Sequence, residues 1–217
     1  MNLDNIEWKI SNSLVKFDHA LNFMEKRVDL IAKNEAKSLI WLLEHEPVYT
    51  AGISAKDSDL INKTNIPIYQ TNRGGKYTYH GPKMIIGYTI LDLKNLFLPK
   101  SPDIALFVNF LENWIIKFLQ EYNIDGFIRK DRVGIWVYEN GEEKKIAAIG
   151  IKVKKWISYH GLAINIDPDI DAFKNIVPCG IKEFGVTSMS KFIDVNNNNQ
   201  SFKQILKNSF YNNLPES

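Results

Sequence analysis

Apolar residues recur at the three- and four-residue spacing of an amphipathic helix in three stretches of the chain. The first covers residues 13–33, and we expect its apolar side to pack in the core rather than on a partner. The second covers residues 104–122, has the widest apolar face, and begins after a Ser-Pro-Asp cap at residues 101–103. A shorter stretch covers residues 202–210. The width of the second face predicts that this helix lies against a sheet.

Short apolar runs between these helices predict β-strands, because charged or turn-forming residues bound them. The clearest pair flanks Asn140-Gly141, and this dipeptide between two apolar runs is typical of a β-hairpin. The hairpin predicts that the strands in the middle of the chain pair antiparallel. The predicted strands are residues 38–43, 66–70, 84–93, 134–138, 145–153 and 156–166.

The order of these elements predicts an α+β fold in which helices flank a mixed, largely antiparallel sheet. No internal repeat and no linker rich in Pro, Gly or Ser divides the 217 residues, and we interpret the polar stretch at residues 196–200 as a loop. A chain of this length buries roughly 70% of the surface that its unfolded form exposes. We therefore expect residues 1–217 to form a single domain.

Composition and charge narrow the classes of function. One cysteine excludes an internal disulfide, a Cys-rich zinc module and an iron–sulfur cluster, and it is typical of a reducing compartment. Basic residues number 27 against 25 acidic residues, so the net charge of +2 predicts no general attraction to nucleic acid or to an anionic membrane. Residues 1–10 hold no apolar leader, and no stretch approaches the roughly 20 apolar residues of a membrane span. We expect a cytoplasmic protein that binds no metal, no nucleic acid and no membrane.

Residues 71–82 are polar and rich in glycine, and they connect two predicted strands. The adjacent Gly74 and Gly75 allow main-chain N–H groups to converge on an anion or on a carbonyl oxygen. Arg73 adds a planar set of donors, and His80 donates, accepts or titrates near neutral pH. A solvated hairpin loop explains the same residues, so this segment alone leaves both interpretations open.

Lys145 begins a predicted strand that holds unusually small residues. Ala147, Ala148 and Gly150 are poor strand formers, and small residues in a strand indicate that something approaches the backbone closely. That neighbour could be a ligand. An exposed charged turn that continues from residues 142–144 is the other interpretation of Lys145.

Cys179 is the single thiol, and it stands between Pro178 and Gly180. A lone cysteine beside apolar residues is often a small core residue. The proline before it and the glycine after it favour a tightly presented nucleophile instead. A nucleophilic cysteine needs its thiolate favoured by a nearby cation, and Lys145 is the candidate.

Six segments are specific when they are taken together and in order. They are residues 44–52, Arg-Gly-Gly-x-x-Thr-Tyr-His-Gly-Pro within residues 71–82, Lys-Ile-Ala-Ala-Ile-Gly at 145–150, His-Gly-Leu-Ala-Ile-Asn at 160–165, Val-Pro-Cys-Gly-Ile at 177–181 and residues 185–189. In this order they resemble the octanoyltransferases of lipoate synthesis. The resemblance covers most of the chain from about Leu42 to Met189.

This resemblance implies a fold similar to the catalytic domains of biotin and lipoate protein ligases. It implies transfer of an octanoyl group from octanoyl-acyl carrier protein, with lipoyl-acyl carrier protein as a further donor. The acceptor is the lysine of lipoyl domains, those of the 2-oxoacid dehydrogenases and of the glycine cleavage H protein, and no cofactor is needed. By the matching positions, Cys179 carries the acyl thioester, and Lys145 lowers the pKa of that thiol and transfers protons.

The resemblance also implies an acyl pocket. The matching residues are Arg73, Gly74, Gly75, Lys76, Tyr77, Thr78, Tyr79, His80, Ala148, Ile149, Gly150, Gly161, Leu162 and Ala163. One position departs from the family, in which Gly-Pro usually continues with Gly-Gln. Here Pro82 is followed by Lys83-Met84, so the shape of the pocket edge is left open.

Two other functions share some of these features. An ATP-dependent lipoate or biotin protein ligase also uses a Gly-Gly loop and an essential lysine, although the Pro-Cys-Gly-Ile segment favours the transferase. A non-catalytic module that binds an acyl carrier would leave Cys179 as a structural residue. Because acyl carrier protein is acidic, we expect a basic patch beside Lys145, with Lys152, Lys154 and Lys155 as candidates. A solvated strand end explains these lysines equally well.

Overall fold

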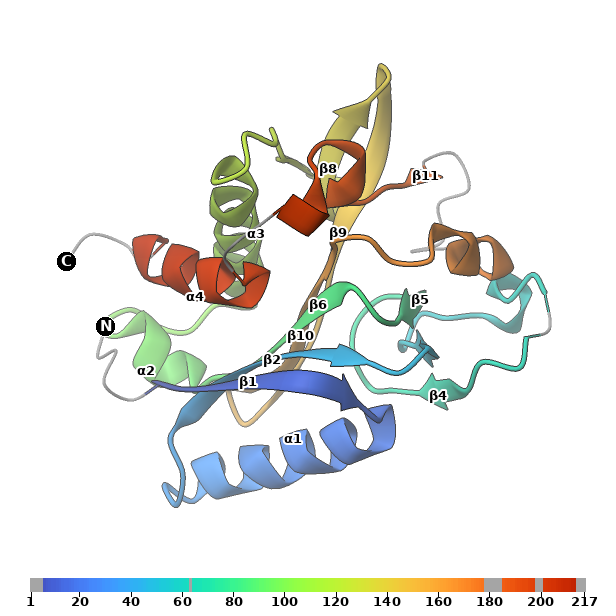
Figure 1. Ribbon diagram of the computed structural model, residues 1–217. Coiled ribbons are helices and arrows are strands. Elements are labelled where there is room, and N and C mark those ends of the chain that lie inside the picture. Colours follow the sequence, from blue (N-terminus) through green and yellow to red (C-terminus); the bar gives the residue numbers. More distant parts are fainter. Residues whose placement is uncertain (1–5, 63, 178–184, 198–200, 214–217) are drawn as a thin grey trace.

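The computed structural model describes residues 6–62, 64–177, 185–197 and 201–213, and an eight-stranded sheet forms its centre (Figure 1). The strands follow the order β1-β2-β6-β10-β9-β8-β7, and β11 pairs with β9. Their bounds are β1 (Ile6–Val15), β2 (Ser38–His45), β6 (Met84–Ile90), β7 (Phe127–Arg129), β8 (Arg132–Glu139), β9 (Glu142–Lys154), β10 (Ile157–Asn165) and β11 (Gly185–Val186). The β1–β2 and β9–β11 pairs are parallel and the other pairs antiparallel, which confirms the predicted mixed sheet.

A small second sheet has the order β4-β3-β5. Its strands are β3 (Val48–Ala51), β4 (Ile68–Gln70) and β5 (Tyr77–His80). Strand β3 runs parallel to β4 and antiparallel to β5. Tyr49 and Tyr79 of this sheet share a hydrophobic cluster with α1, so the small sheet covers part of the same face of the main sheet.

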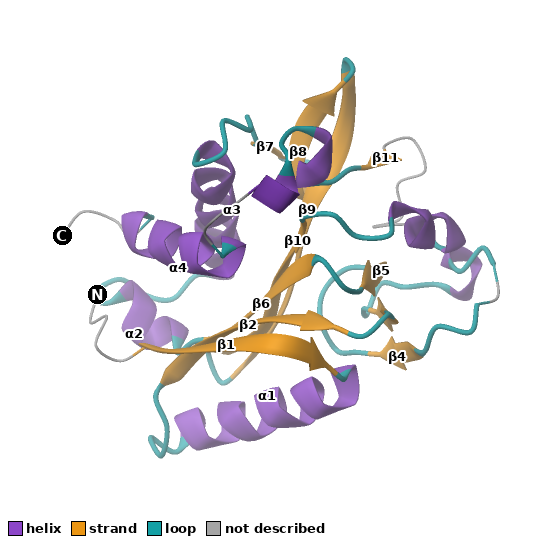
Figure 2. Cartoon of the chain, in the orientation of Figure 1, coloured by secondary structure: helices purple, strands orange, loops and turns teal. Residues whose placement is uncertain are grey.

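Helices cover both faces of the main sheet (Figure 2). The α-helices of the described chain are α1 (Phe17–Ala32), α2 (Leu93–Phe97), α3 (Ile104–Gln120) and α4 (Phe202–Asn212). Short 3-10 helices lie at Asp57–Asp59, Ile170–Asn175, Met189–Lys191 and Val195–Asn197.

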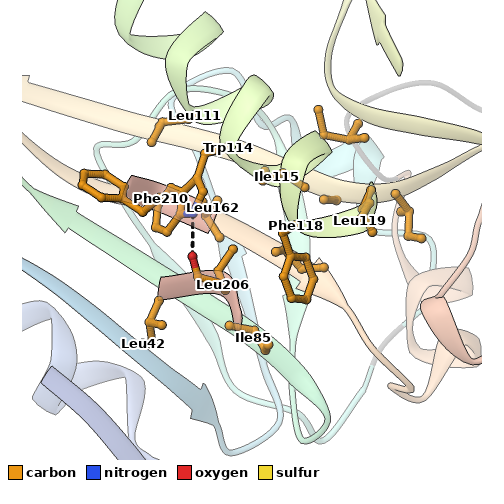
Figure 3. Close-up of a cluster of buried hydrophobic side chains, with 14 of the residues drawn as sticks. Leu42, Ile85, Leu111, Trp114, Ile115, Phe118, Leu119, Leu162, Leu206 and Phe210 are labelled. Atoms are coloured by element: carbon orange, nitrogen blue, oxygen red, sulfur yellow. Dashed lines mark hydrogen bonds between the residues drawn. The ribbon is translucent and has the colours of Figure 1, made fainter. Parts of the chain in front are cut away.

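Two hydrophobic clusters hold these layers together. Along β6, Ile85 packs with α3 and α4, whereas its neighbour Ile86 packs with α1 on the opposite face. On the α3 side, the indole N–H of Trp114 donates to the main-chain carbonyl of Leu206 at 2.7 Å, which ties α3 to α4 (Figure 3). All residues of β6 and β10 are buried, because both strands lie in the middle of the sheet and are covered on both faces.

The predicted helices are confirmed, but the first begins later than its pattern indicated. Residues 13–15 end β1, and α1 begins at Phe17. Leu14 matched the helical repeat, yet its side chain is exposed. Helix α3 begins as predicted after Asp103, whose carboxylate accepts hydrogen bonds from two N–H groups of the first turn at 2.7 and 3.1 Å. The last helix extends to Asn212.

The predicted hairpin is confirmed, because Asn140 and Gly141 join β8 to β9 with φ values of 54° and 83°. The strand predicted over residues 84–93 is shorter. It ends at Ile90, since the carboxylate of Asp92 caps α2.

Other strand predictions were incomplete. The strand predicted over residues 66–70 is limited to Ile68–Gln70, and the predicted loop over residues 71–82 contains β5. The sequence interpretation also missed β1, β3, β7 and β11. Strands β3, β7 and β11 span four, three and two residues, which are too few positions for a periodic signal, and residues of β1 fall into the helical repeat of α1.

Candidate active site

A cavity of about 50 Å³ lies where β5, β6, β9 and β10 meet the loop before β5. Twelve of the fourteen residues predicted to bind the acyl group line it. They are Arg73, Gly75, Lys76, Tyr77, Thr78, His80, Ala148, Ile149, Gly150, Gly161, Leu162 and Ala163. The structure thus brings the loop and β5 together with the paired strands β9 and β10, which are far from them in the sequence.

The other two predicted residues, Gly74 and Tyr79, do not line this cavity. The Gly74 N–H donates to the Ile151 carbonyl at 2.9 Å and so ties the loop to β9. Tyr79 is buried and packs against the rings of Tyr49 and Phe173, at centroid distances of 5.5 and 5.6 Å.

Ile86, Tyr88 and His160 also line the cavity and were not predicted. His160 directly precedes Gly161 in a segment that the sequence had singled out. Ile86 and Tyr88 carry a weaker signal, the two-residue alternation that places both on one face of β6. Which face of β6 lines the pocket depends on the tertiary structure.

Gly150 of β9 and Gly161 of β10 are small because the protein itself packs closely against them, and not because a ligand does. A side chain at Gly150 would come within 3.2 Å of the Arg73 side chain and of the Gly74 carbonyl oxygen. At Gly161, a side chain would begin 2.1 Å from the Gly87 carbonyl oxygen. What comes close at these two glycines is another segment of the protein rather than a ligand.

Arg73 anchors the loop that forms one wall of the cavity. Its guanidinium group donates to the carbonyl oxygens of Thr50 at 2.7 Å, Gly74 at 2.9 Å and Lys76 at 2.9 Å, and to the Thr50 hydroxyl at 2.7 Å. These bonds fix the loop to β3. The donors that the sequence offered to a ligand are therefore engaged within the protein, so Arg73 shapes the pocket.

Three histidines and Tyr88 form a buried cluster at this cavity. His45 contacts a main-chain carbonyl through Nδ1 and the Tyr88 hydroxyl through Nε2, both at 2.7 Å. Nδ1 of His80 and Nε2 of His160 have no hydrogen-bond partner among the described residues. Two unpaired nitrogens thus belong to residues that line the pocket.

The histidines of this cluster are neutral at physiological pH. Burial lowers the pKa of His45 to about 4. Burial, together with the positive charge of Arg73, lowers the pKa of His160 to about 3. The pKa of His80 also lies well below its ordinary value, mainly because of burial and then because of the neighbouring His45 and Arg73.

We expect the free energy of unfolding to fall as the pH decreases from about 6.5 toward 4. The unfolded chain binds protons at histidine near pH 6.5, whereas folded His160 binds one only near pH 3, so the unfolded state holds more protons in this window. At pH 4.5 this residue alone accounts for about 2–3 kcal/mol. Urea unfolding at a series of pH values measures the slope.

The matched variants for this experiment are His160→Asn and His19→Asn. Asparagine accepts the φ of 59° that His160 adopts, and the variant should show a flatter pH dependence. His19 is exposed, so its replacement should leave the slope as it is. Equal slopes for wild type and His160→Asn would contradict the assignment.

Lys145 lies near the start of β9, one of the strands that line the cavity. Its side chain is 6% exposed, so it is no part of an exposed turn. Its Nζ donates to the Val133 carbonyl at 3.0 Å and lies 4.8 Å from the centroid of the Trp136 ring. Lys145 lines a second cavity of about 10 Å³.

The two cavities are neighbours along β9 and β10. Both are lined by Thr78, Ala148 and Ala163. Ala148 and Ala163 are partners in the strand register, so their small side chains leave space at one level of the sheet. We call the two cavities together the slot, which extends from the loop at Arg73 to Lys145.

Cys179, the predicted nucleophile, lies outside the described residues. The nearest described residues are Val177 before it and Gly185 after it. Before it, the Val177 N–H donates to the Asp59 carbonyl at 2.7 Å. After it, Val186 of β11 pairs with Lys145 of β9 and lines the second cavity. Strand β11, which begins six residues after Cys179, therefore lies beside Lys145.

The Lys83-Met84 departure leaves most of the pocket edge untouched. Lys83 adopts a φ of 61° and lines neither part of the slot. Its N–H donates to the Glu44 carboxylate at 2.7 Å and its ammonium group pairs with Asp167 at 2.6 Å, which offsets the cost of this backbone conformation. Met84 lines the second cavity.

The basic patch is not where the sequence interpretation placed it. Lys145 lies near the start of β9, whereas Lys152, Lys154 and Lys155 lie at its far end. Lys154 lies nine strand positions from Lys145, which corresponds to about 30 Å, and Lys155 follows the end of the strand. Lys154 also pairs with Asp29 at 2.8 Å. These lysines are therefore not beside Lys145.

Two further properties concern the part of the chain that the structure describes. It contains no group of three or more His, Cys, Asp or Glu side chains that could hold a metal ion. None of its helices combines the length and apolar character needed to cross a membrane. The titratable residues that line the slot there include Lys145, His80 and His160.

Comparisons with known proteins identify the family to which this chain is related. The sequence profile described as the lipoyl protein ligase A/B catalytic domain matches residues 17–211. An octanoyltransferase from Wolbachia sp. subsp. Brugia malayi is 48% identical over 206 residues, which cover 95% of this chain and 98% of that protein. An octanoyltransferase from Ehrlichia chaffeensis is 44% identical over 210 residues, which cover 97% of this chain and 96% of that protein.

A solved structure shows the same fold at much lower identity. It is that of a bipartite lipoate protein ligase and its E2 lipoyl domain from Thermoplasma acidophilum, with a TM-score of 0.71, 14% identity and coverage of 96% of this chain and 84% of that one. The predicted fold class and the family resemblance are confirmed. The chain belongs to the octanoyltransferases, acyltransferases built on the lipoyl protein ligase A/B catalytic domain.

Proposed function

We propose that this chain transfers an octanoyl group from octanoyl-acyl carrier protein to the acceptor lysine of a lipoyl domain, with Cys179 as the covalent carrier. The main support for this proposal is the slot. It extends to Lys145 and is lined there by Val186 of β11, the described strand that follows Cys179 in the sequence. The 48% identity with an octanoyltransferase supports octanoyl as the acyl group. The proposed acceptors are the lipoyl domains of 2-oxoacid dehydrogenases and the glycine cleavage H protein, and lipoyl-acyl carrier protein is a further proposed donor.

In the first half-reaction, the thiolate of Cys179 attacks the thioester carbonyl of the donor. The ammonium group of Lys145 favours the thiolate by its charge. Main-chain N–H groups hold the oxyanion, and those of Gly75 and Gly180 are the candidates because the Gly74 N–H is engaged by Ile151. The bond to the carrier sulfur then breaks, and Lys145 protonates the departing thiolate.

In the second half-reaction, the neutral amine of the acceptor lysine attacks the acyl-Cys179 thioester. Lys145, neutral after the first step, takes the proton that the amine loses as the amide bond forms. The bond to the Cys179 sulfur breaks, which restores a thiolate beside an ammonium group. The thioester is already activated, so the cycle needs neither ATP nor a cofactor.

The slot is the proposed binding site of the acyl chain. We propose that the slot ends near the hydrogen bond between Gly74 and Ile151, which lies six strand residues or about 20 Å from Lys145. A buried methylene contributes only about 0.8 kcal/mol, so we propose that the position of this end, rather than affinity per carbon, sets the chain length. Because cavities of about 50 and 10 Å³ are small for a ligand, we expect the lining side chains to move as the chain enters.

Two broader properties follow from the same proposal. We propose that residues 1–217 act as one catalytic domain, since the family match spans residues 17–211. A mechanism that depends on the only thiol requires that thiol to stay reduced. The cytoplasm is therefore the proposed compartment.

A comparison of donors tests the proposal. The purified chain is mixed with a lipoyl domain and given either octanoyl-acyl carrier protein or octanoate with ATP and Mg²⁺, and the mass of the lipoyl domain is measured. We expect octanoylation from the carrier alone, and none of a lipoyl domain whose acceptor lysine is replaced by arginine. Modification only with octanoate and ATP would identify a ligase. A chain that binds the carrier but modifies nothing would be a binding module.

A further inference from the structure

The larger of the two cavities forms the half of the slot that lies farther from Lys145, and we call it the distal half. His80, Tyr88 and His160 line it. The two histidines are buried, with 7% and 3% of their surfaces exposed. An octanoyl chain is apolar beyond its carbonyl group, so three polar side chains around its proposed binding site need an explanation.

His160 reaches the slot through an unusual backbone conformation. Its φ of 59° lies in the left-handed region, which is costly for a residue with a side chain inside a strand. In a regular strand, neighbouring side chains point to opposite faces. Here the rings of Tyr159 and His160 are stacked, with centroids 5.2 Å apart, and the Tyr88 ring lies 6.1 Å from that of His160. The conformation therefore turns the imidazole toward Tyr88 and the slot.

The hydrogen bonds of His45 determine which atoms of this cluster are available. Its Nδ1 contacts the carbonyl oxygen of Val15, which can only accept, so Nδ1 carries the proton and Nε2 accepts from the Tyr88 hydroxyl. The Tyr88 oxygen therefore keeps lone pairs for a second partner. Nδ1 of His80 and Nε2 of His160 are unpaired among the described residues. Because each neutral imidazole has one donor and one acceptor nitrogen, the cluster suits a partner that both donates and accepts.

The cations around the distal half already have partners, so an anion is not the expected occupant. Arg73 donates to three main-chain carbonyl oxygens. The ammonium group of Lys76 lies 3.6 Å from the Asp59 carboxylate. A water molecule or a hydroxyl group matches the remaining atoms, because each is neutral and both donates and accepts. The cavity of about 50 Å³ has room for one such group.

We propose that the distal half of the slot contains a polar subsite, in which His80, Tyr88 and His160 hold a water molecule beyond the methyl end of an octanoyl chain and bind a terminal hydroxyl group in its place. A longer apolar chain has to displace that water. Leaving one buried polar atom unpaired costs about fivefold to a hundredfold in affinity, whereas an added methylene gains about fourfold. The subsite therefore rejects longer apolar chains and accepts an octanoyl chain that ends in a hydroxyl group. This inference rests on the proposed function, in which the slot takes the acyl chain.

Nonanoic acid and ω-hydroxyoctanoic acid test the subsite, because their chains have the same length and differ only in a terminal methyl or hydroxyl group. We expect the full chain to bind the hydroxy acid about tenfold more tightly than nonanoic acid in isothermal titration calorimetry. An apolar pocket end would give the opposite order, because it would bury a hydroxyl group without a partner. Tighter binding of nonanoic acid, or no binding of either acid, would overturn the proposal.

His80→Leu removes the ring nitrogens with little change in side-chain volume, and it should bring the two affinities close together. The matched control is His19→Leu, which makes the same change at an exposed site and should keep the wild-type preference. If His80→Leu does not fold, Tyr88→Phe removes only a hydroxyl group and should change the preference in the same direction. An unchanged preference in the folded slot variants would also overturn the proposal.

Binding of the free acids needs no thioester at Cys179, so this test is independent of transfer. A preference for the hydroxy acid in a chain that transfers no octanoyl group would support the subsite and contradict the proposed function. Octanoyl transfer by a chain that prefers nonanoic acid would support the proposed function and contradict the subsite.

Discussion

Cys179→Ser is expected to abolish octanoyl transfer, with a loss of about a thousandfold or more in kcat/KM. A serine hydroxyl is not ionised at neutral pH, and the chain has no other cysteine to replace the lost thiol. Intact-mass analysis after incubation with octanoyl-acyl carrier protein should show one octanoyl group on the wild type and none on the variant. Mild base or hydroxylamine should release that group, as expected of a thioester.

The control for this variant is its folding. Cys179→Ser should unfold at the same urea concentration as the wild type, so that lost transfer reports on chemistry. Retained transfer in the variant would contradict the covalent mechanism. So would a wild-type protein that transfers octanoate without ever carrying it, because the group would then pass directly from carrier to acceptor.

Lys145→Ala should lower kcat/KM by about 10²–10⁴-fold, the usual contribution of a group that transfers protons. It should also raise, by about one unit or more, the pH at which half of Cys179 reacts with iodoacetamide. The reason is the loss of a buried ammonium group on the strand that pairs with β11. A pH series of alkylation, quantified by mass spectrometry, measures the second effect.

Lys144→Ala is the matched control, because Lys144 is the next residue of β9 and its ammonium group lies 3.6 Å from Glu139. It removes the same charge and should change the alkylation profile of Cys179 much less. If Lys145→Ala reacts with the pH dependence of the wild type, Lys145 is not the cation that activates Cys179.

The elements that were predictable from the sequence are those marked by a local pattern, such as an apolar repeat, a helix cap or a turn dipeptide. The long apolar face of α3 and its Asp103 cap predicted that helix, and Asn140-Gly141 predicted the hairpin. Strand β3 has four residues and sits directly after Pro47, so it offered no repeat to detect. Leu14 shows the opposite error, a local pattern that predicted the wrong element. It matched the repeat of the first helix, but it lies in β1 and its side chain is exposed.

The pocket was predictable residue by residue only through the family motifs. Ala148 and Ala163 stand in two such motifs, and the register of β9 with β10 makes them partners. Tyr88 belongs to no motif, and it reaches the pocket because β6 is the other neighbour of β10. Pairing between strands so distant in the sequence is a long-range property that no local pattern contains.

By itself, the sequence determined the fold class, the family resemblance and the residue types of the chemistry, because composition, periodicity and motifs are local. The tertiary structure alone decided which of these residues meet. It engaged the donors of Arg73 within the protein, placed Lys152 and Lys154 at the other end of β9 from Lys145, and buried Lys145 beside Val133 and Trp136. The physical reason is the order of the strands, since backbone pairing brings distant segments together and burial then sets their charges and hydrogen bonds.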